Sequence, residues 1–237
     1  MRGKIHAILP YFICLLAIPV VVVLGATLFN DRQYAFIALA VAILACLPFF
    51  FSFEQNEGSG KLLIIIAVMI AMSATGRFIF AAVPHFKPVT ALVVITAIYF
   101  GAQAGFVTGA TTALISNFYF GQGPWTPFQM FAWGMVGLIA GLLGPLLRKR
   151  NLLSLTLLVL YGVLAGVVYS LLMDTWVTLW WDGQFNLTRY LANVVSAIPV
   201  TVTYAVSNVV FLLVFTFPIG NVLQRIQVKY GIGEKKK

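Results

Sequence analysis

The chain has 237 residues, of which 61% are hydrophobic and only 9% are charged. Soluble domains average about 25% charged residues and about 45–50% apolar residues, so the composition indicates an integral membrane protein and leaves no room for a soluble domain. The formal net charge of +9 comes mainly from basic clusters near both termini and at Arg148–Arg150. Membrane topology explains these clusters better than nucleic-acid binding does, and we expect no nucleic-acid partner.

The first two apolar runs predict an N-terminal hairpin of two membrane-spanning helices, at about residues 8–28 and 34–53. The first run is longer than the apolar part of a signal peptide and lacks a cleavage site of small residues, so we expect it to be retained. Cys14 and Cys46 lie in these runs without metal-ligand spacing, and we expect both to pack as small apolar residues. Residues 1–53 form the first predicted unit.

A polar, glycine-containing linker at residues 54–60 separates this hairpin from the rest of the chain. Six further apolar runs follow, at about residues 61–83, 88–100, 104–120, 127–147, 152–173 and 190–218. Residues 174–189 form the longest polar connection between them. The predicted fold is therefore an all-α membrane protein with a six-helix core at residues 61–220 and a basic tail at residues 221–237.

Eight crossings place both termini on the same side of the membrane. Both termini are basic, and Arg148–Arg150 falls on the same side, so the positive-inside rule predicts a cell-membrane protein with cytoplasmic termini and a cytoplasmic linker. The turns at residues 84–88 and 121–127, together with the 174–189 connection, then face outward together.

Small residues recur at four-residue spacing, which lets membrane helices approach closely. The glycine pairs are Gly101/Gly105/Gly109, Gly137/Gly141 and Gly162/Gly166. Packing within the chain is the favoured interpretation of these glycines. Ala67 and Ala71, with Ala74 on the same helical face, fit internal packing and a contact with a partner protein equally well.

Arg77 is the one basic residue well inside a predicted span, near its outer end. An intramembrane arginine is a candidate functional residue, but its side chain could equally extend to the outer surface. Asn117, Gln122, Trp125 and Gln129 surround the 121–127 turn, where aromatic surface and amides suit an uncharged or amphipathic ligand. His85 could ligate a metal or cofactor, although a single loop histidine is more often simply polar.

Motifs for catalysis are missing from the sequence. It contains no GxxxxGK[ST] phosphate loop, no HExxH and no GxSxG. Asp174 and Asp182 have no second carboxylate at a fixed helical spacing, so paired acid–base catalysis is not supported. We expect Trp176, Trp180 and Trp181 to form an interfacial belt rather than a ligand cage. A transporter without its own energy-coupling site would need partners.

The stretches PVTALVVITAIYFGAQAGFVTGATTALISNF and FGQGPWTPFQMFAWGMVGLIAGLLG resemble the substrate-binding S-components of energy-coupling factor (ECF) vitamin transporters. The resemblance covers about residues 61–218, the six-helix core of that family, and is greatest to its cobalamin-specific members. The N-terminal hairpin departs from the six-helix pattern. Ala67-x-x-x-Ala71 matches the family's AxxxA motif, which docks on a transmembrane coupling subunit that in turn contacts two ATPase subunits.

The resemblance also implies an outward-opening substrate pocket formed by the outer helix ends and the first core connection. Together with the residues around the 121–127 turn, it gives these candidate substrate-binding residues: Arg77, Phe80, Pro84, His85, Phe86, Lys87, Asn117, Gln122, Trp125, Gln129 and Trp180. The candidate partner-interface residues are Ala67, Ala71 and Ala74.

These features together predict a vitamin-binding subunit, with cobalamin as the expected ligand, no catalytic cofactor or metal, and ATP hydrolysis in the partner subunits. Two other classes stay open. A self-contained facilitator would transport without partners, and a small intramembrane enzyme would use His85, Asp174 or Arg77. Within the favoured class, the S-component could also carry another vitamin or a precursor.

Overall fold

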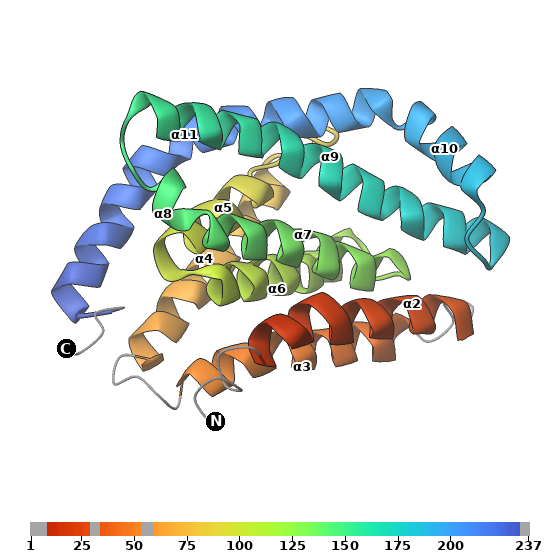
Figure 1. Cartoon of the computed structure of the whole chain (residues 1–237), viewed down its shortest axis with the longest axis horizontal. Coiled ribbons are helices and arrows are strands. Elements are labelled where there is room, and N and C mark those ends of the chain that lie inside the picture. The colour runs from red at the N-terminus through yellow and green to blue at the C-terminus, as the bar shows by residue number, and fades with distance from the viewer. Residues whose placement is uncertain (1–8, 29–33, 54–58, 233–237) are drawn as a thin grey trace.

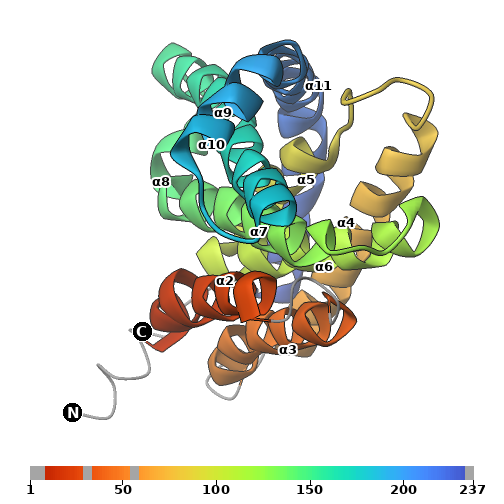
Figure 2. The same ribbon diagram turned by 90° about the vertical axis from the view of Figure 1, so that its right-hand side faces the viewer.

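The computed structural model describes residues 9–28, 34–53 and 59–232, and the elements within these ranges are all helices. The N-terminal hairpin consists of a helix that begins at residue 9, includes the π-helical segment η1 (Ile13–Ala17) and continues as α2 (Ile18–Leu28), followed by α3 (Tyr34–Phe53). Its apolar side chains pack on α6 and α7 of the core (Figures 1 and 2). The hairpin predicted from the sequence is therefore present, and it contacts the core directly.

The core contains the six predicted helices and two short ones. Their bounds are α4 (Ser59–Ile79), α5 (Val89–Phe100), α6 (Ala102–Phe120), α7 (Trp125–Leu142), α8 (Gly144–Leu147), α9 (Leu152–Asp182), α10 (Leu187–Ser196) and α11 (Ile198–Tyr230). In Figures 1 and 2, α9 and α11 lie on one side of α6 and α7, and the hairpin lies on the other. α4 packs beside α5 and α6.

Glycines allow α6 and α7 to approach closely. A Cβ on Gly105 would lie 2.6 Å from the carbonyl oxygen of Gly137, and a Cβ on Gly109 would lie 2.3 Å from that of Trp133. Gly166 of α9 makes a similar approach to the backbone of Ala205 in α11. The expectation that the glycines serve packing within the chain is confirmed for all of them except Gly101, where a Cβ would meet nothing within 4 Å.

The short helix α5 lies at the centre of the core, and each of its residues except Phe100 is buried. Its 12 residues extend about 18 Å, less than the hydrocarbon thickness of about 30 Å. Gly101, at φ 92°, ends α5 and starts α6 in a single residue. Other side chains cover α5 on all sides, and this explains its uniformly apolar sequence.

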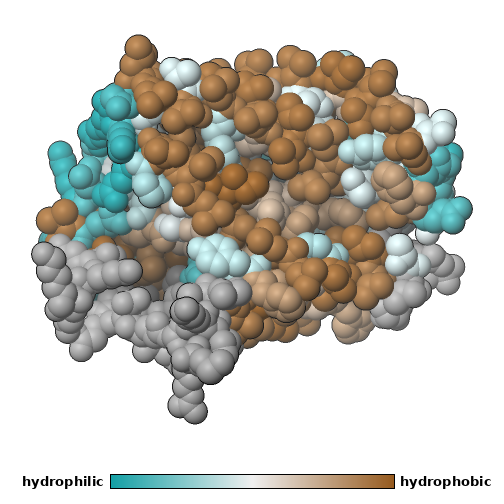
Figure 3. Space-filling view, in the orientation of Figure 1, coloured by the Kyte–Doolittle hydropathy of each residue, from teal (hydrophilic) through white to brown (hydrophobic). Residues whose placement is uncertain are grey.

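The surface matches a membrane environment. Within the part of the chain that the structure describes, three helical segments are long and apolar enough to cross a bilayer, at Gly60–Ile79, Leu152–Asp182 and Ile198–Tyr230. Shorter apolar segments lie at Leu9–Gly25, Phe36–Ala45 and Val89–Phe100. Figure 3 shows a broad hydrophobic belt between hydrophilic residues at the two ends of the bundle. The chain is therefore an all-α membrane protein, whereas the full set of eight crossings stays a prediction.

Three predicted boundaries are wrong. α9 continues through Asp174 to Asp182 and α10 begins at Leu187, so three quarters of the predicted 174–189 connection is helical. The reason is that no glycine or proline occurs there before Gly183, which ends the helix at φ 66°. The short α10 follows, and α11 then runs to Tyr230, so the predicted tail at residues 221–237 begins as helix.

The two ends of the bundle carry different kinds of side chain. The basic end carries Lys61, Arg148–Arg150, Arg225 and Lys229. The aromatic end carries the 80–88 and 121–124 loops, Trp125, Trp180 and Trp181. The side of the membrane that each end faces stays a prediction.

Candidate functional site

Arg77, in the last turn of α4, points into the bundle instead of toward the surface. One guanidinium nitrogen, Nη1, donates hydrogen bonds to Ser116 Oγ (2.5 Å) and Asn117 Oδ1 (2.7 Å) on α6. The guanidinium carbon lies 4.5 Å from the ring centroid of Phe120 and 5.2 Å from that of Trp133. Arg77 therefore joins α4, α6 and α7 from the inside.

The charge of Arg77 has no carboxylate partner among the residues that the structure describes. The one ion pair in those ranges joins Arg189 and Asp182 at 2.5 Å, at the far end of α9. Intramembrane charges are normally paired with another charge or with backbone carbonyls. Here neutral side-chain oxygens and the negative faces of aromatic rings stabilise the cation.

An amide network extends from Arg77 to the 121–124 turn. The side chain of Asn117 is fully buried, and its Nδ2 donates to Thr126 Oγ1 and to Gln129 Oε1, both at 2.9 Å. Thr126 in turn donates to Gln122 Oε1 at 3.0 Å, while Gln122 Nε2 donates to the carbonyl of Leu114 at 2.9 Å. These bonds hold the turn against the ends of both α6 and α7.

A row of aromatic rings leads from Arg77 to the 80–88 loop. Trp133 stacks on Tyr169, with ring centroids 5.3 Å apart and an interplanar angle of 18°. The rings of Tyr169 and Tyr204 meet edge to face at 5.0 Å, and those of Tyr204 and His85 do so at 5.3 Å. His85 Nδ1 also lies 3.2 Å from the hydroxyl oxygen of Tyr204. The row crosses from α7 to α9 and α11 and joins helices far apart in sequence.

The 80–88 loop is attached to α11 by hydrogen bonds and by aromatic packing. The amide of Lys87 donates to Ser207 Oγ at 2.9 Å, and the Ser207 hydroxyl donates to the carbonyl of Lys87 at 3.1 Å. Phe80 and Phe86 contact the ring of Phe211, at centroid distances of 4.9 and 5.0 Å. The loop therefore has a defined position over α11.

The titratable groups of this loop are biased toward their neutral forms. Partial burial, and secondly the charge of Lys87, lower the pKa of His85. Burial, and secondly the charge of Arg77, lower the pKa of Lys87, whose Nζ donates to the carbonyl of Phe80 at 2.8 Å. His85 also has φ 60°, the one positive φ of a non-glycine residue in the described chain. Such left-handed backbone is uncommon and often occurs at functional positions.

The tryptophans form a second aromatic group at the same end. Trp176 lies between Trp125 and Trp180, at centroid distances of 5.9 and 6.2 Å. Its indole Nε1 is buried and has no hydrogen-bond partner. Trp180 and Trp181 are exposed, as expected for an interfacial belt, whereas Trp176 packs inward.

The predicted substrate-binding residues therefore separate into groups. Arg77, Asn117, Gln122 and Gln129 share one network, whereas Phe80, Phe86 and Lys87 pack at the base of the loop. Trp125 and Trp180 belong to the tryptophan group, and Pro84 is exposed on the loop without a resolved contact to the others. Five residues of the network or the aromatic row were not predicted from the sequence: Ser116, Thr126, Trp133, Tyr169 and Tyr204. Tyr169 and Tyr204 could have been found as aromatic residues with a polar hydroxyl inside otherwise apolar helices.

The predicted partner-interface residues of α4 differ in exposure. Ala67 and Ala71 are exposed, so they are accessible to a partner, whereas Ala74 is only 4% exposed and is covered by the chain itself. The reason is that the buried side chains of α4 form a stripe at residues 65–66, 69–70 and 73–74, which includes Ala74, whereas Ala67 and Ala71 lie just outside this stripe. Cys14 is buried, as expected for a packing residue, and the side chain of Cys46 lies outside the described residues.

Groups suited to catalysis or metal binding do not gather at this site. Within the described ranges, no three His, Cys, Asp or Glu side chains lie close enough to hold a metal ion. Asp174 is buried in α9, and Asp182 is paired with Arg189. The assembled groups are instead hydrogen-bond donors, amides and aromatic rings, which suit binding of an organic molecule.

A comparison with known families identifies the chain. The model of the family described as ECF-type riboflavin transporter, S component, matches residues 57–225, which is more than half of the chain. The chain belongs to this family. No curated protein and no solved structure matches it.

Membership of this S-component family makes the chain the vitamin-specific, substrate-binding subunit of an ECF transporter. The resemblance noted from sequence is confirmed at the level of the ECF S-component. The preference for cobalamin is not supported, because the matching family is the riboflavin type. The match begins after the N-terminal hairpin, which agrees with the hairpin's being an addition to the family core.

Proposed function

We propose that the protein binds a vitamin at its aromatic end, between Arg77 and the 80–88 loop. The observation that carries this proposal is the part-buried Arg77 network, in which a cation without a described carboxylate partner adjoins a row of aromatic rings. A flat heteroaromatic ligand can stack on such rings and accept hydrogen bonds from cationic and amide donors. The indole Nε1 of Trp176 is a further donor that such a ligand could satisfy.

Riboflavin is the first substrate that we propose. The family that the chain matches is the riboflavin type, and a flavin ring system is planar and rich in hydrogen-bond acceptors. Cobalamin, which the sequence resemblance favoured, is the second substrate to be tested. A corrinoid is much larger than a flavin and would need a wide opening at this end.

In the proposed transport cycle, the exposed strip of α4 at Ala67 and Ala71 contacts a transmembrane coupling subunit bound to two ATPase subunits. Small side chains at four-residue spacing permit close contact between membrane helices. The basic end, with both termini, lies on the cytoplasmic side of the cell membrane by the positive-inside rule. Vitamin then enters from outside at the aromatic end, and the subunit reorients against its partner. ATP hydrolysis takes place in the partner subunits.

Reconstitution in liposomes tests this proposal. The chain is purified with and without an ECF coupling module, and uptake of labelled riboflavin, cobalamin and other vitamins is followed with and without ATP. We expect riboflavin uptake that requires both the module and ATP. Uptake of cobalamin or another vitamin under the same conditions would overturn riboflavin as the substrate, but the protein would still be an ECF S-component.

Two further outcomes would overturn the class. Uptake of the vitamin without the module would identify a self-contained facilitator. Chemical conversion of a vitamin or lipid by the purified chain alone would identify a membrane enzyme. Binding measured in detergent by quenching of flavin fluorescence separates a failure of substrate binding from a failure of coupling.

A further inference from the structure

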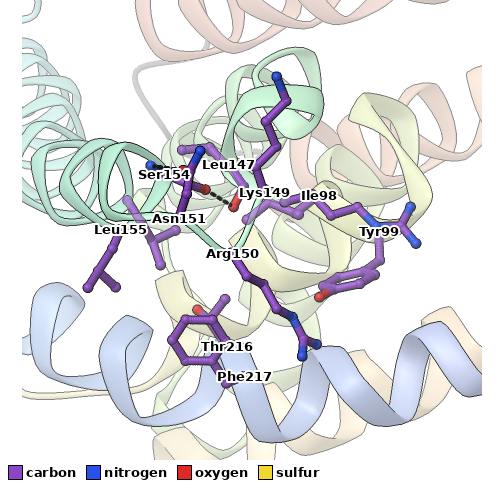
Figure 4. A pocket seen from close by; sticks show the side chains of 12 residues that line it. Ile98, Tyr99, Leu147, Lys149, Arg150, Asn151, Ser154, Leu155, Thr216 and Phe217 are labelled. Atoms are coloured by element: carbon purple, nitrogen blue, oxygen red, sulfur yellow. Dashed lines mark hydrogen bonds between the residues drawn. The ribbon is translucent and has the colours of Figure 1, made fainter.

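A small pocket lies at the basic end, far from the proposed vitamin site. It opens between the α8–α9 turn, the end of α5 and the middle of α11, and its cavity volume is about 20 Å³. Figure 4 shows this basic pocket, lined among others by Arg148, Lys149, Arg150, Asn151, Thr216 and Phe217. Neither the vitamin site nor the alanine strip of α4 includes any of these residues.

Three consecutive cations form one wall of the basic pocket. Arg150 Nη2 donates a hydrogen bond to Asn221 Oδ1, and its guanidinium lies over the ring of Phe217 at 5.8 Å. Figure 4 shows Arg150 extending toward α11 and Lys149 extending the other way. Arg148 lies over the ring of Tyr99 at 4.9 Å.

No described carboxylate offsets these charges. Asp174 and Asp182 are the acidic residues within the described ranges. The nearer of them, Asp174, lies about six turns further along α9, or roughly 33 Å. The potential in the pocket is therefore positive, and aromatic faces and amide oxygens hold the two guanidinium groups in place.

Thr216 gives the basic pocket a buried donor. Its side chain is only 6% exposed, and Oγ1 has no hydrogen-bond partner. Among the other buried helical threonines, Thr96 and Thr108 donate to the carbonyl four residues earlier, whereas Thr112, away from this pocket, is also without a partner. A buried hydroxyl without a partner is unfavourable and uncommon, and an oxygen-rich ligand would satisfy it.

We propose that the basic pocket binds the phosphate group of an anionic membrane lipid. The cations and the Thr216 hydroxyl suit phosphate oxygens, and Leu155 and Leu158 add apolar lining. A lipid is favoured over free phosphate because the pocket adjoins the lipid-facing surface, where Leu152 is 81% exposed and Leu153 is 65% exposed. This inference does not depend on which vitamin the aromatic end binds.

The test measures lipid binding to the full-length chain in detergent by native mass spectrometry and thermal unfolding. The probes are phosphatidylglycerol, phosphatidylcholine and inorganic phosphate. We expect phosphatidylglycerol to bind more tightly than phosphatidylcholine and to raise the Tm. Arg150→Gln should weaken phosphatidylglycerol binding at least about tenfold, because it removes a charge-assisted hydrogen bond to the bound phosphate.

Two variants distinguish a ligand site from a structural role. Thr216→Val removes the unpartnered hydroxyl, so it should leave the Tm without lipid unchanged or higher while weakening phosphatidylglycerol binding. Arg225→Gln removes a charge from the same end outside the pocket and should bind like the wild type. Equal binding by all variants, or equal binding of both lipids, would overturn the proposal. Stabilisation by inorganic phosphate as strong as by lipid would overturn the assignment to a lipid.

Discussion

Replacement of Gly137 by alanine tests whether close approach of α6 and α7 holds the core together. The added Cβ would lie 2.2 Å from the carbonyl oxygen of Gly105 and 2.3 Å from its carbonyl carbon, whereas ordinary contact begins at 3.4 Å. Both atoms belong to the backbone of α6, so no side-chain rotation can relieve the overlap. The two helices would have to separate by about 1 Å, and this would weaken dispersion contacts along their whole interface.

The expected loss of stability is at the upper end of the range for overpacked cores. Overpacking typically costs about 1–3 kcal/mol, and the rigid backbone on both sides places Gly137→Ala near about 3 kcal/mol. For a chain of this size, 1 kcal/mol shifts the Tm by about 2–4 °C, so we expect a decrease of roughly 6–12 °C. Thermal unfolding of the purified protein in detergent, followed by tryptophan fluorescence, measures this shift.

Gly60→Ala is the matched control, because Gly60 lies in α4 and a Cβ there would meet nothing within 4 Å. Alanine is also the better helix former, so this variant should be as stable as the wild type or slightly more stable. A Tm for Gly137→Ala within about 2 °C of the control would refute the reasoning, since it would mean that the two helices separate without loss.

Three further predictions concern the proposed site and its partner. Phenylalanine at both Ala67 and Ala71 should abolish module-dependent uptake and leave vitamin binding in detergent unchanged. Serine at both positions should preserve uptake. Loss of vitamin binding in the phenylalanine variant would contradict the idea that the alanine strip contacts the partner and takes no part in binding. Arg77→Lys should weaken vitamin binding about tenfold or more, because an ammonium cannot reproduce the planar contacts of the guanidinium with Asn117 and the aromatic rings. Unchanged vitamin affinity in a fluorescence titration would show that Arg77 is not part of the binding site. The lowered pKa of His85 means that the unfolded chain binds more protons than the folded one once the pH falls below about 6.5. The Tm of the wild type should therefore decrease relative to His85→Asn between about pH 7 and pH 5, and parallel curves would contradict this.

Composition and apolar runs predicted the helices of this protein well, because apolar length alone decides where a helix can lie in a membrane. The residues at which helices end were harder to predict than the helices themselves. α9 extends to Gly183 because nothing before that glycine stops a helix, although tryptophan and aspartate had suggested a loop. Polarity is a weak signal for a helix end, and the backbone geometry that glycine permits is a stronger one.

Contacts between side chains on different helices were harder still to predict from the sequence. Arg77 and Asn117 were both candidates from sequence, but their hydrogen bond joins residues 40 positions apart and no local pattern encodes it. Tyr169 and Tyr204 were missed for the same reason, since each looks like an ordinary aromatic residue in an apolar helix. Ala74 lies near the helical face of Ala67 and Ala71 but is buried, because it continues the buried row of Ile66 and Ile70 at four-residue spacing.

The position of Arg77 on α4 bears on how the proposed transporter works. α4 carries the half-buried Arg77 in its last turn and the exposed Ala67 and Ala71 near its middle, within a single continuous helix. A vitamin that contacts Arg77 would compete for the hydrogen bonds that tie α4 to Ser116 and Asn117. Because α4 is rigid over this length, a change at Arg77 would shift the alanine strip with it. Substrate occupancy and partner contact would then be coupled through one helix, without a separate relay.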